Sequence, residues 1–166
     1  TRMDDEGLSD LQQLQSLTTL ALAGTHIDGS GLEQLAHLVQ LEELDLSDTA
    51  VDGSALPDIG QLLSLRNLNL NHTYINDESL PHLQSLSELN TLKLNDTPIG
   101  DDGLAYLEES VELRKLFLRS TEVSDTGLEH LKVLVNLTRL DLRNTHVTDA
   151  AVARLEKELP NCEIDA

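Results

Sequence analysis

The sequence predicts an α/β solenoid, in which short strands and short helices alternate along a stack of similar units. Three observations predict this fold. A phrase of 24 residues recurs six times without insertion or deletion, beginning at Leu17, Leu41, Leu65, Leu89, Leu113 and Leu137. Positions 1, 4, 6 and 11 of every copy are Leu, Ile or Val, and position 9 is always Thr. Such a period is typical of stacked units that bury their apolar faces against one another.

Each copy begins with a strand and continues into a helical return. In the copy that starts at Leu113, Leu116 and Leu118 stand two residues apart, which is the period of a half-buried strand. Leu128 and Leu131 then follow at a spacing of three, which suits one face of a short helix. The sequence therefore predicts a strand, a turn and a short helix in every copy.

Fixed residues mark the turn between strand and helix. The threonine at position 9 offers a hydroxyl that can both donate to and accept from the buried backbone at the bend. Position 15 is always Gly, Ala or Ser, which predicts close packing of neighbouring units there. Position 13 is an aspartate in four consecutive copies, where it predicts a helix N-cap. These aspartates are Asp77, Asp101, Asp125 and Asp149.

The pattern LxxLxLxxTxI/VxDxGLxxLxxL resembles the leucine-rich repeat family, and in particular its bacterial subtype with Thr where most members have Asn or Cys. The resemblance covers nearly the whole chain. It implies a right-handed horseshoe with a parallel sheet on the concave side and short helices on the convex side. It implies no particular partner, because the fold serves many functions.

The chain of 166 residues is expected to form a single domain. Residues 1–16 fill the second half of a repeat and are expected to form a half repeat or N-terminal cap. Residues 17–160 hold the six repeats, and residues 161–166 are expected to form a C-terminal cap strand. The start in the middle of a repeat also favours a fragment of a longer protein over a complete chain.

Composition and charge argue against several classes of function. The formal net charge of −19 disfavours nucleic acid and anionic membranes as partners, and self-repulsion favours a monomer. A single cysteine, Cys162, leaves the compartment undetermined, and no apolar run is long enough to span a membrane. We expect no enzyme and no cofactor, because nucleophile motifs, phosphate loops and zinc-site spacings are absent. Calcium at Asp101 and Asp102 is an alternative reading of the aspartate column, although helix capping explains these residues without a metal.

Cations gather on the predicted concave face. Positions 2, 3, 5, 7 and 8 of the six copies hold seven of the eleven Lys and Arg residues and six acids. Random placement would give about two cations. Copies 1 to 3 carry a net −3 at these positions and copies 4 to 6 carry a net +4. The seven cations are Arg66, Lys93, Arg114, Lys115, Arg119, Arg139 and Arg143.

The chain's only phenylalanine, Phe117, stands among these cations at the outward-facing position 5. An exposed ring surrounded by arginines is typical of an interface hot spot. We therefore predict a site for a protein or peptide partner with an anionic segment, made of Phe117, Lys93, Arg114, Lys115, Arg119, Arg139 and Arg143. Two alternatives are that the cations only offset repulsion from the acidic convex side, and that the chain is a structural spacer of a longer multidomain protein.

Overall fold

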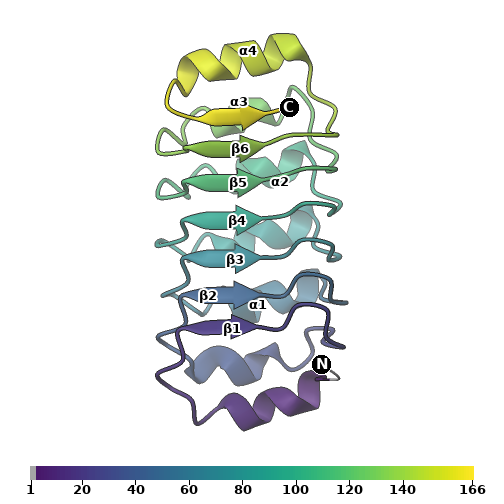
Figure 1. Ribbon diagram of the computed structural model, residues 1–166, viewed down its shortest axis with the longest axis vertical. Helices are drawn as coiled ribbons and strands as arrows, with labels where there is room; N and C mark the ends of the chain where they lie inside the picture. The colour runs from purple at the N-terminus through teal and green to yellow at the C-terminus, as the bar shows by residue number, and fades with distance from the viewer. Residues whose placement is uncertain (1–2) are drawn as a thin grey trace.

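The computed structural model describes residues 3–166 and shows a column of stacked strand-and-helix units (Figure 1). Thr1 and Arg2, which begin the expected half repeat, lie outside the described residues. All strands join one parallel sheet in chain order. They are β1 (Thr19–Ala21), β2 (Glu43–Asp45), β3 (Asn67–Asn69), β4 (Thr91–Lys93), β5 (Lys115–Phe117), β6 (Arg139–Asp141) and β7 (Glu163–Asp165).

Short helices cover one face of this sheet and leave the other face open (Figure 1). Four of them are 3-10 helices: η1 (Asp5–Leu11), η2 (Leu32–His37), η3 (Gly53–Ala55) and η4 (Asp77–Leu83). The α-helices are α1 (Leu56–Ile59), α2 (Asp101–Ala105), α3 (Leu128–Leu131) and the longer α4 (Asp149–Glu158), which lies at the C-terminal end of the column. The parallel sheet and the short helices confirm the predicted α/β solenoid. We call the open face of the sheet the concave face.

The strands pair without any slip in register. Each residue lies beside the residue 24 positions away, so that Leu116 pairs with Leu92 on one side and with Leu140 on the other. The apolar positions 1, 4, 6 and 11 are buried, except for Leu17, Leu20 and Val147 in the first and last repeats. These three pack against the ends of the core. The core is therefore a continuous column of aliphatic side chains.

The position-9 threonines close the turn inside each repeat. Every Oγ1 donates to the backbone oxygen of the leucine three residues earlier, at 2.6 Å in the case of Thr97 and 2.7 Å in the case of Thr121. The residue just before the threonine adopts a left-handed conformation in all six copies. Only Gly24 of this column is a glycine, so composition did not reveal the left-handed turn. The other five have φ of 54–57° and are Asp48, His72, Asp96, Ser120 and Asn144.

The prediction that the position-13 aspartates cap their own helices is wrong. The N-caps are Asn76 for η4, Gly100 for α2, Gly127 for α3 and Thr148 for α4. The aspartates instead bond to the next repeat. Three of the four accept from a backbone N–H there: Asp77 from Gly100 at 2.7 Å, Asp101 from Ser124 at 2.8 Å and Asp125 from Thr148 at 2.7 Å. The fourth, Asp149, stands in the sixth and last repeat. The capping geometry fails because the carboxylate points along the column and not back over its own helix.

Small residues at position 15 make room for these carboxylates. A Cβ added to Gly103 would lie 2.4 Å from Oδ1 of Asp77, and one added to Gly127 would lie 2.4 Å from Oδ1 of Asp101. This contact confirms the close packing predicted at position 15. Repeats 1 and 2 carry Gly29 and Gly53 at position 13, so the junctions between repeats 1 and 2 and between repeats 2 and 3 lack an aspartate bond of this kind.

Replacing Asp101 by alanine is expected to lower the free energy of unfolding by about 1–3 kcal/mol. The change removes the acceptors for the backbone N–H of Ser124 and for its Oγ at 2.5 Å, and leaves these two half-buried groups without a partner in the preceding repeat. Asp102→Ala is the matched control, because Asp102 is the exposed neighbour in the same helix and the substitution changes the charge equally. Urea unfolding measures both. Equal losses in the two variants would show that net charge, and not the bond between repeats, matters.

Candidate functional site

Two hollows on the concave face join into one groove. The first has a volume of about 210 Å³ and lies over β1 to β4, where Thr19, Ala21 and Asn69 line it. The second, of about 360 Å³, lies over β2 to β5 and reaches Lys115 and Phe117. They share the side chains of Glu43, Asn67, Thr91 and Lys93. We call the combined hollow the concave groove.

Phe117 forms the wall of the groove at its C-terminal end. Because β5 pairs in register with β4 and β6, Phe117 lies between Lys93 and Asp141. The ring is half-buried, and Nζ of Lys93 lies 6.0 Å from its centroid. This distance is at the outer limit of a cation–π contact, so the lysine adds little to holding the ring. Ring and ammonium group both face the hollow.

Three of the predicted site cations have no ion-pair partner within residues 3–166. Lys115 and Arg114 are exposed and Lys93 is half-buried. Lys93 and Lys115 line the groove beside Phe117, whereas Arg114 lies next to the groove and lines a smaller hollow at the start of the strands. These three side chains, together with Phe117, are the part of the predicted site that is open to a partner.

Arg143 and Arg119 are engaged with acids of the same face. Nη2 of Arg143 lies 2.6 Å from Oδ2 of Asp141 and its Nε lies 2.9 Å from Oδ1. These bonds lower the pKa of the Asp141 carboxyl below its ordinary value, and Asp141 is only 3% exposed as a result of the coverage. Nη2 of Arg119 lies 3.5 Å from Asp96, and its Nε is buried without a hydrogen-bond partner among the described residues. Arg143 is thus neutralised locally, and Arg119 only weakly.

Arg139 is paired with the last strand. It contacts Glu163 at 2.8 Å and Asp165 at 2.7 Å, both in β7. The net charge of +4 predicted for copies 4 to 6 did not include these two acids, because they follow the sixth repeat. With them, the net charge at the C-terminal end of the concave face is +2. Arg66, farther towards the N-terminus, lies 2.7 Å from Glu88. Charge compensation therefore describes part of the cation cluster.

The groove is acidic over β2, one strand in from its N-terminal end. Glu43 in β2 is exposed and accepts from Nδ2 of Asn67 at 3.2 Å. Asp45, two residues later, accepts from the backbone N–H of Ser47 at 2.9 Å and from its hydroxyl at 2.6 Å, so its carboxylate is held in place at the groove. The groove thus runs from carboxylates over β2 to ammonium groups over β4 and β5.

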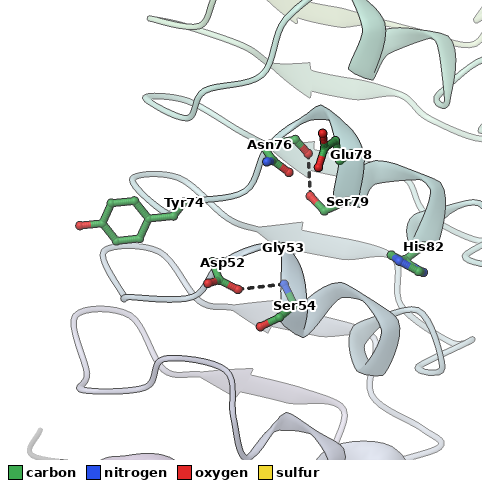
Figure 2. A pocket seen from close by; sticks show the side chains of 8 residues that line it. All are labelled: Asp52, Gly53, Ser54, Tyr74, Asn76, Glu78, Ser79 and His82. Carbon is green, nitrogen blue, oxygen red and sulfur yellow. Dashed lines mark hydrogen bonds between the residues drawn. The ribbon is translucent and has the colours of Figure 1, made fainter.

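A further hollow of about 560 Å³ lies where the strands turn towards the helices (Figure 2). Two of its polar side chains, Asp52 and Ser79, bond to the local backbone. Asp52 accepts from the N–H of Ser54 at 2.8 Å, and bonds with Ser54 lower the pKa of the Asp52 carboxyl. Tyr74 is 68% exposed and points away from the other labelled side chains (Figure 2). The lining shows no convergence of polar groups on a common point.

Potential metal ligands do not gather in groups of three or more His, Cys, Asp or Glu in the described part of the chain. At Asp101, where calcium was the alternative, the carboxylate accepts hydrogen bonds from the backbone N–H and the hydroxyl of Ser124. Burial raises the pKa of the Cys162 thiol to about 11, with a further contribution from Glu163, so the thiol is protonated at neutral pH. None of the described helices has the length and apolarity that crossing a bilayer requires.

Comparisons with known proteins agree with this architecture. The family profile described as Leucine Rich repeat matches residues 13–36, 79–107 and 133–155. No curated protein matches the chain in sequence. An internalin, InlF, from Listeria monocytogenes is similar with a TM-score of 0.68 and 21% identity over 95% of this chain and 49% of that chain. The chain therefore spans about half the length of that structure.

Two further solved structures have the same fold. Internalin InlC2 from Listeria monocytogenes gives a TM-score of 0.73 at 21% identity over 98% of this chain and 75% of that chain. The leucine-rich-repeat ectodomain of a plant membrane receptor kinase from Arabidopsis thaliana, solved in complex with Casparian strip integrity factor 2, gives 0.66 at 21% identity. That match covers 89% of this chain and 18% of the receptor. At this identity the likeness concerns the fold.

Proposed function

Because the chain is a leucine-rich-repeat protein, we propose that it is a non-catalytic recognition module that binds a protein or peptide partner in its concave groove. The observation that carries this proposal is the open cluster of Phe117, Lys93, Arg114 and Lys115 on a chain whose net charge is −19. Unpaired cations around a half-buried ring would gain both ion pairs and apolar contact from an anionic segment.

The predicted binding residues fall into two groups under this proposal. Phe117, Lys93, Arg114 and Lys115 make the direct contacts. Arg119, Arg139 and Arg143 form the far rim, where each already faces an acid of this chain. Arg119 is the rim residue held least firmly by its own acid, because the contact of its Nη2 with Asp96 is long, at 3.5 Å, and its side chain is 42% exposed. A carboxylate of the partner would therefore engage Arg119 more readily than Arg143.

The comparison structures support a general role in binding. The plant receptor ectodomain was solved with a named factor bound, so this architecture holds a partner in that protein. The likeness extends to the fold only, and the partner of this chain is proposed from its own groove. We further propose that the chain acts as a monomer, because two copies of charge −19 repel each other.

A structural spacer is the second candidate. The ion pairs of Arg139 with Glu163 and Asp165 favour it, since they show a cation joining β6 to β7 along the column. A spacer would tolerate changes in the concave groove and would depend on its end repeats. The two functions thus differ in their response to substitutions at Phe117 and Lys115.

Phe117→Ser combined with Lys115→Glu is expected to reduce capture of the partner at least about tenfold, since it removes the ring and reverses an exposed charge. Affinity capture from an extract of the source cells, with the wild-type chain as reference, measures this. Tyr74→Ser combined with Lys157→Glu is the matched control, because both residues are exposed and lie outside the groove. Unchanged capture by the groove variant would favour the spacer.

A further inference from the structure

The concave groove carries opposite charges over β2 and over β4 and β5, in the same columns of the sheet. Glu43 and Lys115 both occupy position 3 and are both exposed, and three strand spacings separate them. At about 4.8 Å per spacing, the two charges lie about 14 Å apart. Asp45 and Lys93 repeat this order in the position-5 column over two spacings. A ligand lying along the column therefore meets carboxylates first and ammonium groups second.

The middle of the groove is uncharged, because Asn67, Asn69 and Thr91 line it. Amides and hydroxyls of this kind both donate and accept hydrogen bonds, so they suit the alternating N–H and C=O groups of an extended backbone. Each strand is three residues long, so the floor along the strand direction is about 10 Å wide. An extended segment fits this floor better than a helix, which is about 10–12 Å across with its side chains.

We infer that the occupant of the concave groove is an extended peptide segment with charges in a fixed order. A basic residue lies over Glu43 and Asp45, and an acidic residue about four residues away lies over Lys93 and Lys115. This spacing follows from about 14 Å at roughly 3.4 Å per residue. An apolar residue beyond the acidic one packs against Phe117. The inference rests on the proposed function and adds the charge pattern of the partner.

A uniformly acidic segment fits this groove less well. Its residues over β2 would face Glu43 and Asp45, where like charges repel and where the surrounding chain is strongly negative. A uniformly basic segment would meet Lys93 and Lys115 with the same result. The two charged regions therefore select against both single-sign partners and in favour of a segment that carries both charges.

Selection of a phage-displayed library of random ten-residue peptides on the full chain tests this inference. We expect enriched peptides to carry a basic and an acidic residue about four positions apart, with an apolar residue on the far side of the acid. The same selection on the charge-swap variant Glu43→Lys/Lys115→Glu is expected to lose this charge order, because Asp45 and Lys93 keep their charges and each charged region then carries one charge of either sign. This variant keeps the net charge, and both positions are exposed, so the fold is preserved.

An enriched peptide should bind the charge-swap variant about tenfold more weakly than the wild-type chain, because two exposed charge contacts become repulsive. Peptides that lose binding to Phe117→Ser, yet show no charge order and bind the charge-swap variant equally well, would overturn the inference and leave the recognition function standing. A selection that yields no peptide dependent on Phe117 would overturn both. Circular dichroism of each variant confirms that it is folded.

Discussion

Replacing Leu116 by alanine is expected to lower the free energy of unfolding by about 2–5 kcal/mol. Leu116 is fully buried at position 4 of β5, between Leu92 and Leu140 of the flanking strands. Constant repeat length fixes both neighbours in register, so the column cannot close around the lost side chain without moving two junctions. The cavity term therefore adds to the lost transfer free energy.

The control for this prediction is the same substitution at the end of the column. Leu20 occupies position 4 of β1 and is only partly buried, because it has one neighbouring strand. Leu20→Ala should therefore cost clearly less than Leu116→Ala. Urea unfolding followed by circular dichroism measures both midpoints and slopes. Equal losses in the free energy of unfolding at the two positions would show that a second neighbouring strand does not increase the cost of removing the leucine side chain.

Gly60→Ala is expected to destabilise the protein by about 1–3 kcal/mol or more. The backbone of Gly60 is helical, with φ −63°, so helix propensity alone would make alanine better by about 1 kcal/mol. The steric term opposes this gain. A Cβ at Gly60 would lie 2.2 Å from the backbone oxygen of His82 in the next repeat, and a backbone atom cannot rotate away as a side chain can. We expect the steric cost of this clash to exceed the free energy gained from the higher helix propensity of alanine.

Gly7→Ala provides the matched control for Gly60. Gly7 lies in η1, and its added Cβ would meet only the flexible side chain of Met3, at 3.3 Å. This substitution should not destabilise the protein, and helix propensity is expected to raise the free energy of unfolding by up to about 1 kcal/mol. Thermal and urea unfolding of the two variants decide the sign. Stabilisation by Gly60→Ala would mean that repeats 2 and 3 can separate freely at this contact.

The strand register and the outward-facing columns were predictable because the repeat has a constant length. Once each unit has 24 residues, every outward residue must lie beside its counterpart, which places Phe117 next to Lys93. The clash at Gly60 was not predictable in this way. Its column holds long side chains such as Gln84 and Lys132 in other repeats, so only the local path of α1 explains the close approach.

The role of the position-13 aspartates was missed because a helix cap and a bond to the next repeat have the same local sequence. A signal for the second role does exist between copies. A glycine occupies position 15 of the next repeat after Asp5, Asp77 and Asp101, whereas alanine or serine follows Gly29 and Gly53. Asp125 is the exception, because Ala151 follows it. This association between position 13 of one repeat and position 15 of the next, 26 residues later, indicates a contact along the column.

The open and the paired cations of the site could not be told apart by position within the repeat. Arg139 and Lys115 share position 3, but Arg139 has Glu163 beside it and Lys115 has no acid at that distance among the described residues. In the sequence, Glu43 and Asp45 entered only as part of the net charge of the first three repeats. Their place in the groove depends on the hollow over β3, which Asn67 and Asn69 line.

The two junctions without an aspartate bond flank repeat 2, the repeat that carries Glu43 and Asp45. Under tension along the column axis, these two junctions resist separation without that bond, although Ser64 and Ser85 donate across them to backbone oxygens. A segment lying in the groove from β2 to β5 would bridge the junction between repeats 2 and 3. Occupancy would therefore add a mechanical link where the aspartate bond is missing.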